Sequence, residues 1–261
     1  MTRVATIALL TLREALRRRL VAAFVAISAA LVGLSAWGFD RLSHSRSLTS
    51  GELQVSLPQS LVLFMFMFSF VVALSASAIS SPSISGEVES GVLQVVATRP
   101  VRRSEIVLGK WLGLATLLAL YAAVVSALEF VVVDAVSGFL PPAPVAVAAY
   151  LFAEGVVLLT LALALSTRLP ALATGVLGIA LFGASWLAGV VGTLGSSFHV
   201  AALRTVGDVA RFVLPTDGLW RGAIYYLEPH SYLARRVAEA VGSKGNPFFV
   251  SSPPDWPYLV F

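Results

Sequence analysis

Five stretches of this sequence are each long enough and apolar enough to cross a membrane as a single α-helix. They cover residues 20–39, 59–80, 108–133, 144–166 and 169–194. A helix needs about 20 apolar residues to cross the hydrocarbon core of a bilayer, and lipid allows only helices and closed barrels to span it. Barrel strands would alternate apolar and polar residues over segments of about ten residues. Because the five stretches are continuous, they predict helices.

The composition supports an all-α fold, a polytopic membrane helical bundle with five spans. The chain is 57% hydrophobic and only 12% charged, whereas a soluble domain carries about 25% charged residues. So few charges cannot cover a water-facing surface, and the apolar excess must therefore face lipid. The absence of cysteine excludes disulfides and thiolate metal sites. We attribute the net charge of +4 to arginines at the membrane edges, so we expect no nucleic-acid partner.

The basic residues predict a multi-pass protein of the cell membrane with a cytoplasmic N-terminus. In that orientation the basic residues on the inner side are Arg3, Arg13, Arg17, Arg18, Arg19, Arg99, Arg102, Arg103, Lys110 and Arg168. Only Arg41 and Arg46 lie in the first two outer loops, as the positive-inside rule requires. The other basic residues follow the fifth span, in a segment too long to report on orientation.

The two ends of the chain are predicted to differ from the spans. Residues 1–19 are predicted to form an amphipathic helix in the membrane surface, although a plain positively charged flank is the alternative. Its apolar arc would consist of Ala5, Leu9, Leu12, Leu16 and Leu20. Residues 195–255 contain charges and prolines and predict a small outer subdomain of short helices, in which Asp217 and Arg221 lie one turn apart. Trp256 and Tyr258 are typical interface anchors, so residues 256–261 predict the start of a sixth span.

Several residues inside the spans are candidates for the translocation path or for a dimer interface. The fifth span carries small residues at every fourth position: Ala180, Ala184, Ala188 and Gly192. Gly175 is a further small residue in the same span. Such a ridge favours close helix contact, within one chain or between two copies. Glu154 and Glu129 are ionisable groups within spans, where charge is costly and often functional. For Glu154 a hydrogen-bonded structural role is the alternative, whereas Glu129 and Asp134 are expected to reach the outer headgroups.

Motifs for catalysis are absent from the sequence. The only Gly-Lys pair, Gly109-Lys110, continues into Trp111 and is not part of a phosphate-binding P-loop. The three histidines lack the spacing of metal ligands, and no serine-nucleophile elbow occurs. We therefore expect that this chain is not itself an enzyme and holds no catalytic or metal-binding residue.

The most informative segment lies between the second and third spans, at residues 83–110. Glu87 and Glu89 stand near the start of a predicted short helix, where acidic residues suit the helix dipole. Pro100 prevents the helix from continuing through Arg99, and Ser104 is placed to cap the third span. An apolar face would be formed by Val88, Val92, Leu93, Val95 and Val96. This pattern predicts a helix over about residues 85–98 along the inner membrane face, and an ordinary solvated loop is the alternative.

The order of motifs in this segment resembles that of a known family. An acidic-x-acidic-x-Gly motif is followed by a hydrophobic helix, an Arg-Pro-x-Arg-Arg motif and a Gly-Lys pair at the third span. With the N-terminal helix and the spans, these motifs make the whole chain resemble the permease subunits of type-2 ATP-binding-cassette exporters (ABC-2 type). Residues 168–175 (RLPALATG) and 214–221 (LPTDGLWR) resemble the branch that contains the permeases of nitrous-oxide-reductase maturation.

The resemblance implies a permease that forms the translocation path, pairs with a second permease copy and docks a separate ATPase subunit. ATP and Mg would belong to that ATPase, so no cofactor is expected in this chain. The segment around residues 85–98 would be the coupling helix, and the N-terminal helix would be a second ATPase contact. The residues implied in coupling are Glu87, Glu89, Gly91, Leu93, Arg99, Pro100 and Arg102. The outer helices would cap the path, and a sixth span is usual in the family. The absence of this sixth span before Phe261 would reflect truncation, an unfinished chain or a five-span variant.

Two other classes of function remain open from the sequence. An ion-driven secondary transporter would combine discontinuous spans with paired ionisable residues at the midplane. A non-transporting membrane scaffold or assembly factor would need neither feature. The substrate is not readable from the sequence: lipid, drug, peptide, polysaccharide and sulfur or copper species all remain open.

Overall fold

The computed structural model describes residues 3–44, 50–91, 102–228, 248 and 250, and within these residues all regular structure is helical. The helices in chain order are α1 Arg3–Leu16, α2 Arg19–Ser43, α3 Ser50–Ser80, the 3₁₀ helix η1 Ser81–Ser83, α4 Ser85–Glu89, α6 Arg103–Ser137, α7 Pro144–Ser166, α8 Ala171–Ser197, α9 Ala201–Val213 and α10 Thr216–Leu227. The predicted all-α fold is confirmed. The predicted start of a sixth span at residues 256–261 lies outside the described residues.

In the part of the chain that the structure describes, five helices are long and apolar enough to cross a membrane: α2, α3, α6, α7 and α8. The polytopic bundle predicted from the sequence is therefore confirmed. The fourth predicted span coincides with α7, whereas α8 begins two residues later than predicted because Pro170 forms its N-cap. With 35 residues, α6 is about 52 Å long, more than the roughly 30 Å of a hydrocarbon core. At ordinary tilt angles, part of α6 therefore extends beyond the hydrocarbon core.

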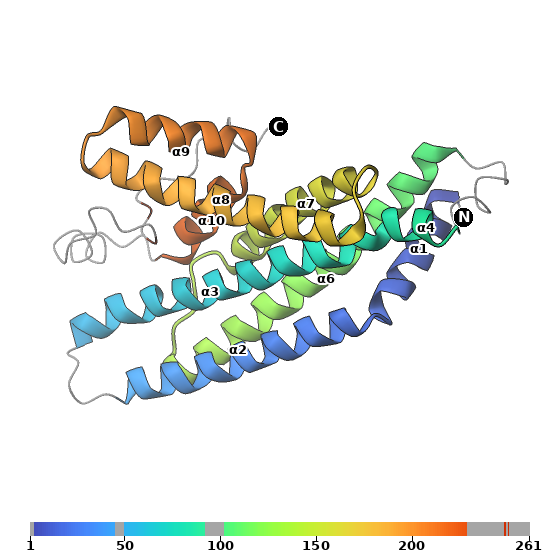
Figure 1. Cartoon of the computed structure of the whole chain (residues 1–261). Helices are drawn as coiled ribbons and strands as arrows, with labels where there is room; N and C mark the ends of the chain where they lie inside the picture. The colour runs from blue at the N-terminus through green and yellow to red at the C-terminus, as the bar shows by residue number, and fades with distance from the viewer. Residues whose placement is uncertain (1–2, 45–49, 92–101, 229–247, 249, 251–261) are drawn as a thin grey trace.

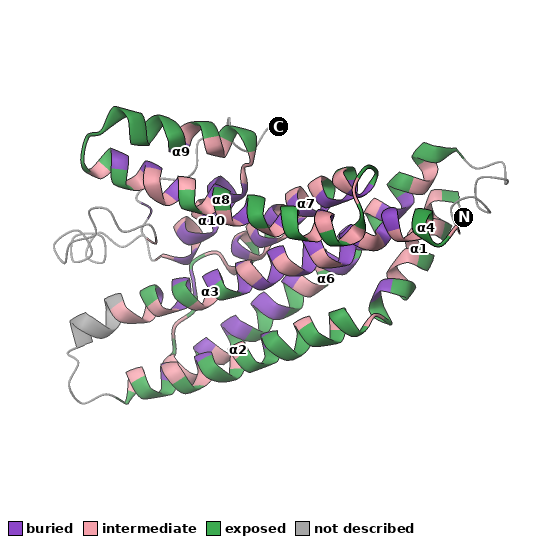
Figure 2. Cartoon of the chain, viewed as in Figure 1, coloured by how far each residue is buried: buried purple, intermediate pink, exposed green. Residues whose placement is uncertain are grey.

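Helix α3 is the centre of the bundle and α2 lies at its edge (Figures 1 and 2). Of the most apolar part of α3, 67% is buried, against 11% for α2. Helices α2, α7 and α8 all pack on α3, and α6 packs on α2 and α7. The largest cluster of buried side chains joins α3 to α7 and α10, with Met65, Leu151 and Ile224 among its members. The exposed outer side of α2, green in Figure 2, includes Val25, Ile27 and Leu34 and is an apolar surface left for lipid or a partner.

Helix α1 packs against one end of α6 through two glycines. A Cβ atom at Gly109 would lie 2.6 Å from the Cβ of Ile7, and one at Gly113 would lie 2.5 Å from the carbonyl oxygen of Ala8. Ala15 on the same side of α1 is buried. The face of α1 that contacts α6 therefore differs from the arc of leucines noted in the sequence, since Leu9 and Leu16 are exposed.

Replacing Gly113 with valine is expected to displace α1 from α6 and to lower stability by about 1–3 kcal/mol, the usual cost of overpacking. The measurement is thermal unfolding of the purified chain, together with the rate of tryptic cleavage at Arg13 in α1. Gly33→Val is the matched control, because a Cβ atom at Gly33 would meet nothing within 4 Å. Equal unfolding temperatures for the two variants would contradict the packing described here.

After α8 the chain turns back and packs on its own spans. His199 at the turn has a φ of 58°, and α9 then runs antiparallel along α8 (Figure 1), with Gly207 against Gly192. At the end of α9, Ser185 Oγ donates to the carbonyl oxygen of Leu214 at 3.0 Å. Because Ser185 lies near the middle of α8, α9 returns over about half the length of that span. Helix α10 is then buried against α7.

Within residues 195–255, for which the sequence predicts a small outer subdomain of short helices, the short helices α9 and α10 pack directly on α8 and α7. The small residues predicted for close contact serve partly within the chain: Gly192 is buried against α9, whereas Ala180 and Ala184 are exposed. Residues 229–247 lie outside the described residues.

Candidate functional site

The segment after α3 is tied to α6 by a buried lysine. Lys110 of α6 has only 8% of its side chain exposed, and its Nζ lies 2.6 Å from Oε1 of Glu87 in α4. The same ammonium group donates a hydrogen bond to the carbonyl oxygen of Ser83 in η1. A buried ammonium is costly unless it is paired and hydrogen-bonded, and here it has both kinds of partner. Lys110 therefore joins η1 and α4 to α6.

The local sequence explains why Glu87 reaches Lys110. Pro82 lacks a backbone N–H and cannot continue α3, so the chain forms the short 3₁₀ helix η1 after Ser80. Ser85 Oγ donates to the carbonyl oxygen of Ser81 at 2.9 Å, which holds the start of α4 against η1. Glu87 is in the first turn of α4. Gly91 follows the helix with a φ of +74°, a conformation that favours glycine.

Helix α1 closes the other side of this joint. Thr11, Glu14 and Arg18 line a small hollow together with Glu87 and Lys110. Arg18 Nη2 donates to Glu14 Oε1 at 2.7 Å, so the end of α1 carries its own ion pair. Helices α1 and α4 thus meet the same stretch of α6, from Gly109 to Leu114.

The predicted coupling residues have different environments in the structure. Glu87 faces Lys110, whereas Glu89 is exposed at the end of α4. Arg102 is the N-cap residue of α6, and its backbone N–H donates to Glu105 Oε2 at 2.8 Å. Ser104 lies inside α6 and is not its cap, because the helix begins one residue earlier. Helix α4 ends at Glu89, within the segment predicted as one helix over about residues 85–98. Leu93, Arg99 and Pro100 lie outside the described residues.

Glu154 is enclosed between α7 and α3. Only 1% of it is exposed, and Ser69 Oγ lies 3.0 Å from Oε1 and 2.9 Å from Oε2, to which the hydroxyl donates. Ser69 is itself fully buried. The glutamate is therefore part of the core of this chain and does not reach its surface.

Glu129 is equally buried, between α6 and α2. It has no exposed surface, and Ser35 Oγ donates to its Oε2 at 2.8 Å, while Oε1 has no hydrogen-bond partner. The prediction that Glu129 reaches the outer headgroups is wrong, because α2 covers this side of α6. Asp134, one and a half turns further along, is exposed.

A third polar cluster joins α8, α9 and α10. Arg211 Nε lies 2.8 Å from Oδ2 of Asp217, and Arg221 Nη1 donates to Thr193 Oγ1 at 2.8 Å. The pair of Asp217 with Arg221 suggested by their spacing is replaced by a pair with Arg211, which no spacing rule singled out. Burial lowers the pKa of Arg221, and the positive charge of Arg211 adds to this effect. These contacts hold the returning helices to the span.

Of the other predicted candidates, Gly175 lies beside Ser81, and Ala184 is exposed on α8. Ala188 is half-buried, with its carbonyl oxygen close to Gly207 of α9. Among the described residues, no group of three His, Asp or Glu side chains could hold a metal ion.

Comparison with known proteins connects this arrangement with membrane transport. The family model described as ABC-2 family transporter protein matches residues 5–237. The chain belongs to this family. The match starts within α1 and includes all five spans, α4 and the hollow around Lys110. An ABC-2 transporter protein is a membrane component of an ATP-binding-cassette exporter and is not itself the ATPase. A comparison with curated proteins found no match.

Proposed function

We propose that this ABC-2 protein is the permease subunit of an exporter driven by a separate ATPase, and that Lys110 couples the two. The observation that carries the proposal is the joint at which Lys110 of α6 holds Glu87 of α4 while Gly109 and Gly113 receive α1. The helices α1 and α4 thus both contact the same end of α6, the longest span. A force applied to either helix acts on α6.

The outward side of α4 supplies the contact for the ATPase. Val88 is 53% exposed, and Glu89 and Ser90 beside it are exposed as well. Glu87 points the other way and is the internal half of the joint. In this account an ATPase that closes on nucleotide would push α4 as a rigid body, and the ion pair would pass the displacement to α6.

The proposed orientation has the N-terminus in the cytoplasm of a cell-membrane protein. Helices α1 and α4 lie at the same end of α6, and the run from Arg17 to Arg19 links α1 to α2 at that end (Figure 1). The positive-inside rule favours the cytoplasm for this arginine-rich end.

We also propose that two permease copies assemble with the ATPase subunits. Helix α2 is the least buried span. On α8, the exposed small side chain of Ala184 would let a helix of a second copy approach closely. The motifs at residues 168–175 and 214–221 support a place in the nitrous-oxide-reductase-maturation branch. The ion-driven alternative has less support, since α2, α3, α6, α7 and α8 are each one continuous helix, whereas such carriers use broken spans.

The test is capture of an ATP-binding-cassette ATPase subunit from the same genome, co-expressed with the tagged permease. Val88→Asp combined with Glu89→Arg is expected to weaken capture at least about tenfold, because interface centres lose roughly 2 kcal/mol or more on such changes. Asp134→Arg, at an exposed position on the opposite end of α6, is the control and is expected to capture normally. Capture and ATP-dependent transport that are indifferent to both α4 substitutions would refute the proposed contact.

A further inference from the structure

Helix α9 turns its polar side toward the rest of the protein and leaves its apolar side exposed. Gly207 packs against Gly192 of α8, and Arg211, one turn further on, lies 2.8 Å from Asp217 of α10. The side turned away from α8 is apolar, and its exposed fractions are Val206 50%, Val209 57%, Phe212 67% and Val213 73%. Much of α9 is therefore green in Figure 2. A helix on the surface of a water-soluble domain has the reverse arrangement, with its apolar stripe facing the core.

Contacts between the two helices show how far α9 reaches along α8. The pairs in contact, from the end of α8 backward, are Gly195 with Arg204, Gly192 with Gly207, and Ser185 with Leu214. Each turn of α9 therefore lies level with a known turn of the span (Figure 1). Since a hydrocarbon core of about 30 Å takes about 20 helical residues, a core that begins near Ala171, the first residue of α8, ends near Val190. The last turns of α9, from about Val209 to Leu214, lie inside that limit.

The exposed residues of α9 change character at the same depth. Arg204 and Thr205, level with the end of α8, are exposed polar residues. From Val206 to Val213, by contrast, every exposed residue is apolar. The change from polar to apolar matches the passage from the headgroup region into hydrocarbon.

The charges in the deeper half of α9 lie on the side and flank nearer α8. Asp208 has 48% of its side chain exposed and pairs with Arg211 at 3.4 Å. At 3.6 residues per turn, Asp208 lies about 100° around the helix from Gly207, whereas Val209 and Val213 lie at about 200° and 240°. The face opposite α8 therefore carries no charge in this half of the helix.

The backbone at the deep end of α9 is paired, as lipid requires. The Leu214 N–H donates to the carbonyl oxygen of Ala210 at 2.9 Å, and the Leu214 carbonyl oxygen accepts from Ser185 Oγ at 3.0 Å. Pro215 has no N–H, and its carbonyl oxygen accepts from the Leu219 N–H at 2.9 Å. Unpaired backbone groups in hydrocarbon are costly, and these two residues at the turn into α10 have none.

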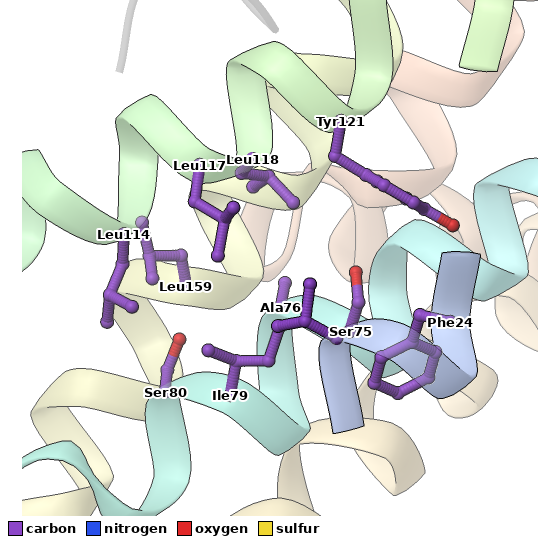
Figure 3. Close-up of a pocket in the computed structure, with 11 residues that line it drawn as sticks. Phe24, Ser75, Ala76, Ile79, Ser80, Leu114, Leu117, Leu118, Tyr121 and Leu159 are labelled. Atoms are coloured by element: carbon purple, nitrogen blue, oxygen red, sulfur yellow. The ribbon is translucent and has the colours of Figure 1, made fainter. Parts of the chain in front are cut away.

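The spans have little room to bury the apolar side of α9. Moving this side into the bundle would need free space between the spans. The hollow between α2, α3, α6 and α7, lined by Ile79 and Leu117 among others, holds only about 30 Å³ (Figure 3), the volume of one water molecule. That space is too small for a valine side chain. A partner for the apolar side must therefore come from outside the described helices.

We propose that the last turns of α9 lie in the hydrocarbon of the bilayer and that Val209, Phe212 and Val213 contact lipid tails, with Val206 at the edge. Helix α9 then enters one leaflet beside α8 without crossing the membrane, at the end of the bundle away from α1 and α4 (Figure 1). Lipid is the partner because the neighbouring span is itself exposed at this depth: Leu187 of α8, level with Phe212, is 58% exposed. The proposal goes beyond the exporter function and needs neither the ATPase nor a direction of transport.

The test measures the depth of nitroxide spin labels on single cysteines, which the cysteine-free sequence allows, in the full chain in phosphatidylcholine vesicles. Collisions with oxygen report hydrocarbon, and collisions with a water-soluble nickel chelate report water. Val209→Cys and Val213→Cys are expected to give an oxygen-to-nickel ratio at least about threefold above that of Thr205→Cys, because hydrocarbon excludes a polar complex. Leu187→Cys is the depth-matched reference on α8 and should give a ratio close to that of Val213→Cys.

Two results would overturn the proposal. A ratio at Val209 and Val213 as low as that of Glu89→Cys, at an exposed position on α4, would place this part of α9 in water. Labels reached by neither oxygen nor nickel would mean that protein covers the apolar side. Spin–spin broadening that disappears on dilution with unlabelled chain would identify that cover as a second copy.

A charge on the lipid side gives a second readout. Val213→Asp is expected to raise the nickel access of a label at Val209 at least about threefold, since a carboxylate in hydrocarbon is costly and draws the end of α9 toward water. Thr205→Asp, at the headgroup level, is the matched control and should leave that label unchanged. Unchanged nickel access with Val213→Asp would contradict the proposal. If Val213→Asp fails to fold, the label depths in the otherwise unchanged chain still decide, and their failure would leave the coupling proposal untouched.

Discussion

Replacing Glu154 with alanine is expected to lower the stability of the folded chain by about 3 kcal/mol, a sum of cavity formation and an unpaired buried hydroxyl. The glutamate is 1% exposed, and both of its carboxylate oxygens accept a hydrogen bond from the Ser69 hydroxyl. Truncation would leave the Ser69 hydroxyl without this partner between α3 and α7. In detergent solution, the loss should lower the unfolding temperature by roughly 6–10 °C for a chain of this length.

Two variants accompany this experiment. Glu154→Gln keeps the length of the side chain and an oxygen acceptor for Ser69, so its unfolding temperature should stay close to that of the unchanged chain. Glu89→Ala, at an exposed position, should also have no measurable effect. If Glu154→Ala unfolds at the same temperature as Glu89→Ala, then the buried contact with Ser69 does not stabilise the bundle.

Glu154→Gln also separates the two roles considered for this residue. A place in the translocation path predicts that transport fails while the unfolding temperature is unchanged. A purely structural role predicts normal transport. The enclosure of the carboxylate between two spans makes this the sharpest substitution for that question.

Replacing Lys110 with alanine is expected to uncouple transport from ATP hydrolysis. The change frees α4 from α6 without removing the outward residues of α4 that contact the ATPase in our account. Since 29% of the Glu87 side chain is exposed, its carboxylate can regain water, and the usual cost of about 3–5 kcal/mol for breaking a buried pair should be reduced. We expect hydrolysis by the assembled complex to continue while transport falls at least about tenfold, measured in the same vesicles.

Glu87→Gln should give a weaker version of the same defect, because an amide still accepts a hydrogen bond from Lys110 but carries no charge. Arg103→Ala is the control on the same helix, since Arg103 is exposed and lies outside the joint. Normal transport by Lys110→Ala, with hydrolysis unchanged, would mean that the ion pair plays no part in transmission.

The spans could be predicted from the sequence because each depends only on a continuous apolar run. For α7 even the bounds agree, since Pro144 starts the helix and Ser166 ends it before Arg168. The contacts of the polar residues could not be predicted in this way. Ser69 and Glu154 are 85 residues apart in the chain, and Ser35 and Glu129 are 94 apart. Which spans become neighbours decides these pairs, and hydrophobic periodicity carries no information about it.

The candidate site was predicted in part. Glu87 and Gly91 stood out by their motif, but the direction of Glu87 toward α6 depends on η1, whose turn at Pro82 sets the path of the chain. Lys110 was visible as part of a Gly-Lys pair, and its position between Gly109 and Gly113 was the available signal that α1 and α4 meet there. Gly207 was the corresponding signal for the return of α9 along α8.

The most direct test of the central claim measures whether α4 and α6 move as one body. The sequence has no cysteine, so Gly86→Cys in α4 and Leu120→Cys in α6 would supply the only two thiols for spin labels. A Cβ atom at Gly86 would meet only Pro82 at 3.5 Å, an ordinary contact, and Leu120 is 57% exposed, so the labels should be tolerated without touching the proposed ATPase contact at Val88. In the complex with the ATPase, the account predicts the same distance between the two labels without nucleotide and in the vanadate-trapped state, and a changed or broadened distance once Lys110→Ala is added. A distance that differs between the two states while Lys110 is intact would contradict it.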